Sequence, residues 1–425
     1  MPSTSPEPRH SPKTARIRRR KARIRRRKAR LRRRKARLLY GAVALLYWAS
    51  LYTYVPTLPN YAHTFTSDLA LVGLIISMYG LWQALLRLPL GVMGDWAGRR
   101  KPFILMGLVL SAGGALLMGF AHDPAALLVG RSVTGLAAAA WVPLTVAFSA
   151  LYPPEEAIRA TTVLTLMSAL ARVTATGANG PLNAAGGYPL AFTVAAVIAG
   201  LALLLLIPAP EHRKSGAAPT AGGIWQLVTR SDVLAPALLN ALIQYLIQGI
   251  SFGFVPLLAR ELGASDQAIS LMTVVHLALI TPALMALTLL LKRFRPRTLV
   301  IACFAILAAG AACAAMAHSI AWLFASQALT GIGYGTGYSI LMGMSIERVD
   351  GAERTTAMGL HQSVYAIGMF AGPWLSGILA DSAGIRPMFG WTAAGVLILG
   401  VFGTILATRK RPSAIQPRSG GRNPS

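Results

Sequence analysis

Acidic residues and cysteines are both scarce in this sequence. Its 425 residues include 14 Asp and Glu and two cysteines, Cys303 and Cys313. Ten residues of helix span about 15 Å, so these cysteines lie too far apart for a disulfide bond. No group of metal-ligating residue types surrounds them, and no pattern of a nucleophile or a phosphate-binding loop appears elsewhere. The sequence therefore predicts neither a metal centre nor an enzyme.

Charged residues are also few, and apolar residues dominate the chain. Charged side chains make up 13% of the sequence, whereas about 25% is usual for a soluble domain. Hydrophobic residues make up 54%, and the mean hydropathy is +0.54. A water-soluble protein cannot expose so much apolar surface, so the composition predicts an integral membrane protein.

Apolar segments of about 20 residues follow one another from Leu38 onward, and this length crosses about 30 Å of hydrocarbon as a helix. We expect an all-α polytopic membrane protein with twelve transmembrane helices, six on each side of a break at residues 209–231. The expected spans lie near residues 39–58, 69–92, 102–121, 124–151, 157–182, 188–208, 233–257, 267–291, 297–317, 319–346, 355–380 and 387–408.

Basic residues in the loops predict how these spans are oriented. With the N-terminus inside, the internal loops hold 13 Arg and Lys and the external loops hold two. Such a bias marks cytoplasmic loops, so we expect a multi-pass protein of the cytoplasmic (inner) membrane with both termini in the cytoplasm. The expected parts are a basic cytoplasmic tail (1–38), an N-terminal six-helix half (39–208), a cytoplasmic linker (209–231), a C-terminal six-helix half (232–408) and a second cytoplasmic tail (409–425).

The two halves carry related short sequences. R-S-V-T-G at 131–135 returns as Q-A-L-T-G at 327–331, and the Gly-Pro pair at 180–181 returns 192 residues later. A duplicated six-helix unit is typical of transporters, because a site between two repeats can face either side of the membrane. We expect the following residues to serve helix packing: Gly135, Gly180, Pro181, Gly372 and Pro373.

The loop after the second span carries G-V-M-G-D-W-A-G-R-R-K at 91–101. This sequence resembles the motif GxxxDxxGR[RK] of the major facilitator superfamily, which lies between the second and third spans of that family. Arg131 and Gly135 resemble the RxxxG motif of its exporters, and V-P-T-L-P at 55–59 resembles bacterial members. The resemblance covers residues 39–408. It implies two pseudo-symmetric six-helix halves and a secondary transporter that works by alternating access.

The resemblance also implies a role for the loop motif as a conformational gate. Asp95 would pair with charges at the cytoplasmic ends of neighbouring helices and help to lock the outward-facing state. Gly91 and Gly98 would allow close helix approach and a tight turn. The remaining motif residues would act as gate partners and topology anchors: Arg99, Arg100 and Lys101.

Two segments depart from the pattern of the family. The loop at 291–297 (L-K-R-F-R-P-R) keeps the basic charge but lacks the Asp and the glycines. In G-P-L-N-A-A-G-G at 180–187 the final glycine pair is spaced more widely than in the antiporter motif, so we expect this pair in the external turn.

Polar side chains inside apolar spans form stripes that predict a cavity wall, since polar groups are costly in hydrocarbon unless they face a cavity. Span five carries seven polar residues on one helical face between Thr161 and Asn183, with Arg172 at the centre. The alternative for single Ser or Thr residues is hydrogen bonding between helices. The predicted cavity residues are Arg131, Arg172, Thr176, Asn179, Asn240, Gln244, Gln248, His276, Gln327, Tyr334, Tyr338, Gln362 and Tyr365.

Ionisable residues within the spans favour some substrates over others. The acidic residues of the spans and loops lie in loops or at span ends, so exchange of cationic drugs against protons is disfavoured. Arg131 and Arg172 favour an anionic, zwitterionic or neutral amphiphilic substrate, since Arg can bind a carboxylate or phosphate with two hydrogen bonds. Arg87 lies near the cytoplasmic end, and we expect it to snorkel to the surface. His276 can carry a coupling proton or form a structural hydrogen bond, and both readings stay open.

The main hypothesis is a transporter of small organic molecules that exports amphiphilic compounds. The alternative within transport is uptake or exchange of organic anions through the buried arginines. A membrane-tethered protein that binds polyanions is less favoured, because one span would suffice as an anchor. The sequence predicts no cofactor and leaves proton coupling open. We expect a functional monomer in a lipid bilayer.

The N-terminal tail repeats a basic heptad. A-R-I-R-R-R-K begins at residue 15, and 16 of the 24 residues at 15–38 are Arg or Lys. The tail runs directly into the first span, where each basic residue beside anionic headgroups can contribute about 1 kcal/mol. We therefore expect an anchor to anionic lipids, with a dispensable repeat expansion and a nucleic-acid arm as the less favoured alternatives.

Overall fold

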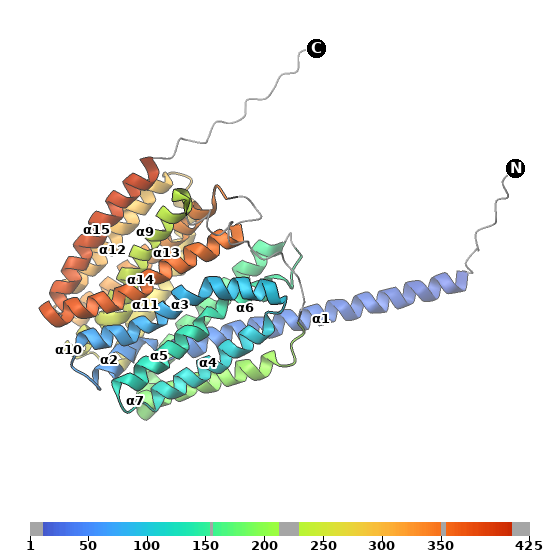
Figure 1. Cartoon of the computed structure of the whole chain (residues 1–425), viewed down its shortest axis with the longest axis horizontal. Coiled ribbons are helices and arrows are strands. Elements are labelled where there is room, and N and C mark those ends of the chain that lie inside the picture. Colours follow the sequence, from blue (N-terminus) through green and yellow to red (C-terminus); the bar gives the residue numbers. More distant parts are fainter. Residues whose placement is uncertain (1–11, 154–155, 212–228, 350–353, 410–425) are drawn as a thin grey trace, which may run out of the picture.

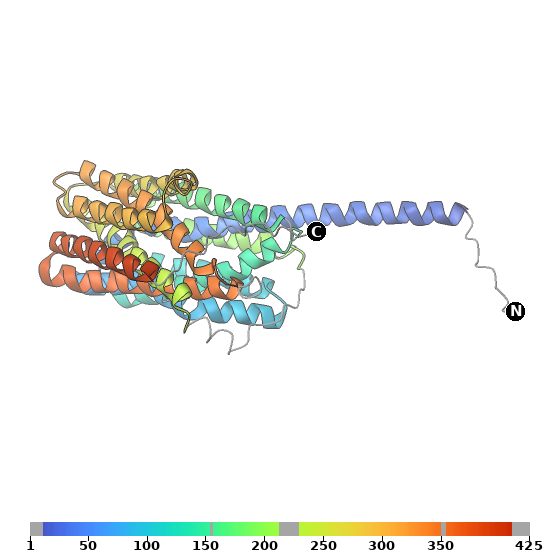
Figure 2. The ribbon, with the colours of Figure 1, turned by 90° about the horizontal axis from the view of Figure 1, so that it is seen from above.

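The computed structural model describes residues 12–153, 156–211, 229–349 and 354–409, and the regular elements of these residues are all helices. The helices pack side by side in one bundle, beyond which the first helix extends toward its N-terminal end (Figures 1 and 2). The helices that precede residue 212 are here called the N-half, and those that follow residue 228 are called the C-half. The all-helical fold that the sequence predicts is thus confirmed.

Within the described residues, the N-half contains six helices of eight residues or more and two shorter elements. They are α1 (Pro12–Tyr52), the 3₁₀ helix η1 (Val55–Thr57), α2 (Leu58–His63), α3 (Leu69–Ala97), α4 (Lys101–Gly119), α5 (Pro124–Ala139), α6 (Trp141–Ser149) and α7 (Ala157–Leu206). The C-half contains α9 (Ser231–Leu246), the π-helix η3 (Ile247–Phe254), α10 (Val255–Glu261), α11 (Asp266–Leu290), α12 (Pro296–Ala315), α13 (Ile320–Ile346), α14 (Arg354–Ala383) and α15 (Ile385–Arg409).

Ten helical segments within the described residues are long and apolar enough to cross a membrane. One of them, Arg159–Leu206, holds two expected spans, because α7 is interrupted at Gly186 and Gly187. The 27-residue helix α13, which is not among the ten, occupies the place of the expected span at 319–346. With α7 counted as two spans and α13 as one, the twelve expected spans all have a helical counterpart.

Proline and glycine explain where the long helices break. The first span turns through η1, because Pro56 and Pro59 have no N–H to continue the α-helical ladder. In α7, Gly187 has φ +69°, a backbone conformation that favours glycine. Gly186 and Gly187 are exposed in a turn between two helical segments, as the sequence predicts.

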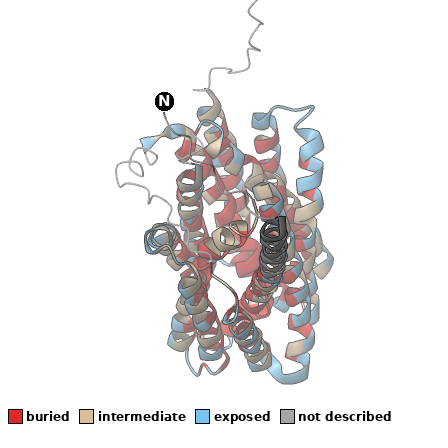
Figure 3. Cartoon of the chain, turned by 90° about the vertical axis from the view of Figure 1, so that its right-hand side faces the viewer, coloured by how far each residue is buried: buried red, intermediate tan, exposed pale blue. Residues whose placement is uncertain are grey.

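The burial pattern is that of a membrane protein rather than of a soluble one. Buried residues occupy the middle of the bundle, and many exposed residues lie on its outside (Figure 3). Large apolar side chains are among the exposed ones, including Leu204, Leu289 and Ile398, each 64% exposed. A soluble protein rarely exposes so many large apolar side chains, whereas hydrocarbon covers them without penalty.

The two halves meet tightly at one end of the bundle, here called the sealed end, where residues 64–68 and 262–265 connect consecutive helices. At Gly180 of α7, an added Cβ would lie 2.5 Å from the Cα of Gln267 in α11. Helices α3 and α14 also pack along each other, and Leu69 N donates to Asp381 Oδ1 at 3.2 Å. At position 180 the two halves are therefore too close together to leave room for a side chain.

The expected packing residues of the other spans also lie at close helix contacts. A Cβ on Gly135 would lie 2.9 Å from the carbonyl oxygen of Met78, and one on Gly372 would lie 2.4 Å from that of Tyr245. Both contacts join neighbouring helices of the same half. Pro181 and Pro373 lie inside α7 and α14.

Candidate functional site

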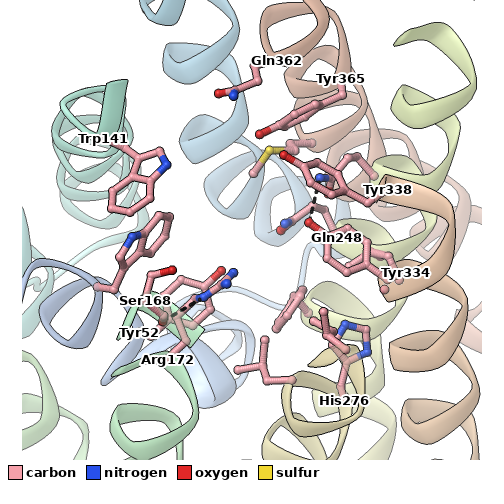
Figure 4. A pocket seen from close by; sticks show the side chains of 18 of the residues that line it. Tyr52, Trp141, Ser168, Arg172, Gln248, His276, Tyr334, Tyr338, Gln362 and Tyr365 are labelled. Atoms are coloured by element: carbon pink, nitrogen blue, oxygen red, sulfur yellow. Dashed lines mark hydrogen bonds between the residues drawn. The ribbon is translucent and has the colours of Figure 1, made fainter. Parts of the chain in front are cut away.

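A cavity of about 250 Å³ lies between the two halves near the middle of the bundle (Figure 4). The N-half contributes residues of α1, α3, α6 and α7 to its wall, and the C-half contributes residues of α9, η3, α11, α13 and α14. Eight residues that the sequence predicts for the cavity do line it: Arg172, Gln244, Gln248, His276, Tyr334, Tyr338, Gln362 and Tyr365.

The N-half wall places Arg172 among aromatic rings. Its guanidinium carbon lies 5.2 Å from the ring centroid of Trp48 and 5.7 Å from that of Tyr52. The Nε–H group donates to the carbonyl oxygen of Ser168, one turn earlier on α7, at 3.3 Å. Trp141 continues the aromatic wall, since its ring centroid lies 5.1 Å from that of Trp48. The charge is therefore held by ring faces and one carbonyl group.

Arg87 also lines the cavity, which corrects the expectation that it snorkels to the surface. It is 5% exposed, and its guanidinium donates hydrogen bonds to Tyr365 Oη and Gln83 Oε1. Its surroundings explain the difference, because α14 packs along α3 as far as Leu88 and covers the arginine. The bond to Tyr365 joins the N-half to the C-half.

The C-half wall is aromatic but carries no fixed charge. The ring centroids of Tyr334 and Tyr338 lie 5.6 Å apart, and those of Tyr338 and Tyr365 lie 5.7 Å apart. Gln244 Nε2 donates to Tyr334 Oη at 3.3 Å. Gln244, Gln248 and Phe252 face the cavity at intervals of four residues through α9 and η3. This wall offers ring faces, hydroxyl groups and amides to a ligand.

The formal charges among the described lining residues of the cavity are all positive. Its described lining residues include Arg87 and Arg172 and no Asp or Glu. Among the residues that the structure describes, no group of three or more His, Cys, Asp or Glu could hold a metal ion. The two positive charges in an aromatic enclosure favour an anion, because a guanidinium can bind a carboxylate or phosphate through two N–H groups.

Five residues that the sequence predicts for the cavity lie outside it. The guanidinium of Arg131 is buried 4.3 Å from the ring centroid of Tyr79. The other four residues lie between helices, away from the cavity. Asn240 bonds with His361 Nε2 at 2.8 Å, Gln327 Nε2 donates to the Ser251 carbonyl at 2.9 Å, Thr176 is buried, and Asn179 lies at the sealed end.

Asn179 belongs to a hydrogen-bond network that joins the halves at the sealed end. Its Oδ1 accepts from Thr57 Oγ1 at 2.9 Å and from Ser270 Oγ at 3.1 Å. Asn183 Nδ2 donates to Asp266 Oδ2 at 2.9 Å and to Thr57 Oγ1 at 2.9 Å. The C-terminal part of the polar stripe of span five thus closes one end of the bundle, while Thr165, Ser168 and Arg172 line the cavity.

The loop motif at 91–101 is described in part. The burial and contacts of Gly91 and Asp95 lie outside what the structure describes, so the expected roles of these two residues stay predictions. Gly98 has φ +59°, as a tight turn requires. Lys101 Nζ donates to the carbonyl oxygens of Ile207 and Ala209 at 2.7 and 2.8 Å, which ties the motif to the end of α7. Arg99 is exposed and Arg100 is half-buried.

Several cavity residues escaped the sequence analysis. They are Trp48, Tyr52, Tyr79, Gln83, Arg87 and Trp141. Tyr79, Gln83 and Arg87 recur every four residues on α3 and therefore share one helical face, a signal that could have found them. The tryptophans gave no such signal, because an aromatic residue does not stand out in an apolar span.

Comparisons with known proteins agree with this architecture. Over 186 residues the chain is 30% identical to the uncharacterised MFS-type transporter YwoD of Bacillus subtilis (strain 168), covering 44% of this chain and 40% of that protein. Over 71 residues it is 37% identical to the inner membrane transport protein YajR of Escherichia coli (strain K12), covering 17% and 15%. Both matches therefore span less than half of the relative.

A solved structure resembles the whole bundle. It is a bacterial homolog of the human lysosomal transporter Spinster in an inward-facing, unoccupied conformation, with a TM-score of 0.77 and 16% identity over 89% of this chain and 97% of that one. The family model of the Major Facilitator Superfamily matches residues 40–241 and again residues 237–425. The chain therefore belongs to the Major Facilitator Superfamily, a family of secondary transporters and not of enzymes.

Proposed function

We propose that this transporter carries amphiphilic organic anions through its central cavity and exports them. The observation that supports the proposal most directly is the position of Arg172, in an aromatic wall of a cavity whose described lining residues include no carboxylate. The anionic group would bind the guanidinium, and the apolar body would lie against the rings of Trp48 and Tyr338. The export direction is supported by the resemblance of Arg131 and Gly135 to the exporter motif.

Electrostatics favour an anion over a cation in this cavity. Two guanidinium groups without a carboxylate among the described lining residues repel a cationic ligand, and the effect is stronger in a buried site than in water. A charge-assisted hydrogen bond contributes about 1.5–3 kcal/mol, which is roughly 10- to 100-fold in affinity. The aromatic faces add apolar contact area to an amphiphilic ligand.

Alternating access would connect the cavity to each side of the membrane in turn. The hydrogen bonds of Asn179 and Asn183 at the sealed end support a state closed on that side. The excess of basic residues in the loops at the opposite end supports a cytoplasmic position for that end and for both termini in an inner membrane. The sealed end would then be the outer gate.

The proposal is tested with three ligands that differ in charge and share one aromatic body. Cinnamate, cinnamyl alcohol and cinnamylamine are added to the purified full-length protein, and thermal stabilisation and Kd are measured. Cinnamate is expected to stabilise the protein most. Arg172→Gln should weaken its binding by about 10- to 100-fold, Arg172→Lys should weaken it less, and Arg293→Gln should leave it unchanged, because Arg293 is exposed at the turn after α11. Equal binding of the three ligands, or cinnamate binding that survives Arg172→Gln, would exclude the anion proposal.

A second candidate is export of uncharged amphiphilic compounds, which the rings of the cavity favour. In that case cinnamyl alcohol binds as well as cinnamate, and Arg172→Gln leaves the Kd of both unchanged. Direction is measured separately in inside-out and right-side-out vesicles loaded with a labelled anion. Net uptake or one-for-one exchange into right-side-out vesicles would support the carrier alternative. Flux with and without a proton gradient measures proton coupling.

The basic tail is proposed as an anchor to anionic lipids. Most of its side chains lie outside the described ones, but Arg37 at its end donates to the Leu151 carbonyl at 3.0 and 3.1 Å and stacks 3.9 Å from the ring of Tyr152. The tail therefore leaves the bundle from a fixed point within α1, beside the residues that follow the C-terminal end of α6. Anionic headgroups at this level would attract its Arg and Lys residues.

A further inference from the structure

His276 lies in the cavity wall on the side opposite to Arg172 (Figure 4). It belongs to α11 of the C-half, whereas Arg172 belongs to α7 of the N-half. The imidazole is fully buried between the rings of Phe252 and Tyr334, at centroid distances of 5.2 and 6.3 Å. The function proposed above does not use this side chain.

The hydrogen bonds around Thr330 assign the protons of His276. Thr330 Oγ1 has one hydrogen, which it donates to a carbonyl of the preceding turn, that of Ser326 at 3.0 Å or of Gln327 at 3.2 Å. Thr330 Oγ1 also accepts from Ser251 Oγ at 3.1 Å. His276 Nδ1 lies 3.1 Å from the same oxygen, which has no further hydrogen to give, so Nδ1 carries the proton and donates.

This assignment leaves the second ring nitrogen without a partner. In the neutral ring Nε2 has a lone pair and accepts a hydrogen bond. Nε2 is buried and has no hydrogen-bond partner among the described residues. Buried polar atoms almost always have a partner, so an unpaired acceptor in a cavity wall needs a donor from another source.

Protonation of Nε2, in addition to Nδ1, would not give the ring a hydrogen-bond partner at Nε2. The ring would then carry a positive charge in a cavity that already holds Arg87 and Arg172, with no acidic residue among its described lining residues. The new N–H would also lack an acceptor. Burial of an unpaired charge costs more than burial of an unpaired neutral acceptor. The neutral ring with a free Nε2 lone pair is therefore the form that fits this wall.

We propose that the anion bound by Arg172 also carries an O–H or N–H donor, and that His276 Nε2 accepts this hydrogen bond. The inference rests on the anion-transport function proposed above and narrows its substrate class to amphiphilic anions with a hydrogen-bond donor away from the anionic group. Such a substrate touches both halves at once.

Specificity follows from the unpaired acceptor. An analogue that lacks the donor leaves Nε2 buried and unpaired, whereas the correct substrate satisfies it. The difference should be at least about tenfold in Kd, as for other buried polar groups left without a partner. His276 thus selects among anions that Arg172 alone would bind alike.

The test compares cinnamate with 2-, 3- and 4-hydroxycinnamate, which share the carboxylate and differ by one hydroxyl group. Kd is measured by calorimetry on the full-length protein. His276→Asn keeps a donor to Thr330 but removes the acceptor at the Nε2 position, whereas His276→Gln places an amide oxygen near that position. His318→Asn is the matched control, since His318 is exposed and lies outside the cavity.

One hydroxyl isomer is expected to bind the wild-type protein at least about tenfold more tightly than cinnamate. His276→Asn should abolish this advantage, His276→Gln should retain part of it, and His318→Asn should retain all of it. The inference is overturned if cinnamate binding depends on Arg172 but no hydroxyl isomer gains affinity, or if the gain survives His276→Asn. Cinnamate binding that is independent of Arg172 refutes the proposed function instead, and failure of the whole series to bind counts against both.

Discussion

Gly180→Ala should open the sealed end of the bundle. A Cβ at this position would lie 2.5 Å from Gln267 Cα, 2.9 Å from Gln267 N and 3.0 Å from the carbonyl oxygen of Asp266. All three atoms belong to the backbone of α11 and its start, so no side chain can turn away to make room. Carbon atoms in ordinary contact are about 3.5–4.0 Å apart, so α7 and α11 must separate by about 1 Å.

This separation is enough to break the hydrogen bonds between the halves. The distance from Asn183 Nδ2 to Asp266 Oδ2 would grow from 2.9 Å, and that from Ser270 Oγ to Asn179 Oδ1 from 3.1 Å, to about 4 Å. One bond to a carboxylate and one neutral bond together contribute about 2–4 kcal/mol. The sealed state should lose that free energy relative to a state open at this end, a change of roughly 30- to 1,000-fold in the ratio of the two populations.

The assay is a distance measurement across the sealed end. Spin labels at Ser67→Cys in the N-half and Glu261→Cys in the C-half are read by double electron–electron resonance, with Cys303 and Cys313 replaced by Ala. Gly180→Ala should shift the distribution to longer distances.

The control keeps the same substitution in the same helix. Gly200→Ala also lies in α7, but its Cβ would meet no atom within 4 Å, so the sealed distance should persist. An unchanged distribution for Gly180→Ala, or an equal shift for Gly200→Ala, would refute the reasoning.

Three further predictions concern the cavity, the C-half and the tail. Tyr365→Phe removes the hydroxyl that accepts a hydrogen bond from Arg87 of α3 and should lower the free energy of unfolding by about 1.5–3 kcal/mol. The control Tyr245→Phe should change the free energy of unfolding little. His361→Leu leaves a buried amide of α9 unpaired and should cost about 1–3 kcal/mol in the same assay; an equal loss for His318→Leu would speak against a specific bond. Deletion of residues 2–32 should preserve transport in vesicles and reduce binding to liposomes that contain anionic lipid, and loss of transport would contradict the anchor proposal.

The helices were predicted well because the apolar segments are long and because glycine or proline marks the places where helices break. The turn at Gly186 and Gly187 follows from backbone freedom, and the bend through η1 follows from Pro56 and Pro59. These breaks depend on the residues at the break itself, so they can be predicted from the sequence without knowledge of the packing.

The cavity was predicted in part, because a helical period gives the direction of a side chain but not what covers it. Arg172 and Asn179 share one face of α7, yet one lies in the cavity and the other in the sealed end. The difference depends on how deep each residue lies and on where α11 packs against α7. Arg87 was misplaced for the same reason, since α14 covers a position near the end of a span.

The unbalanced charge of the cavity gives the proposed transport cycle an electrical asymmetry. The empty cavity carries the two positive charges of Arg87 and Arg172, and a bound monoanion cancels one of them. A membrane potential acts on each charge with about 2.3 kcal/mol per 100 mV when the charge crosses the whole field. An inside-negative potential would therefore pull the empty carrier toward its cytoplasm-facing state more strongly than the loaded one. Voltage would then speed the return step of an exporter by more than it slows the outward step of the loaded carrier.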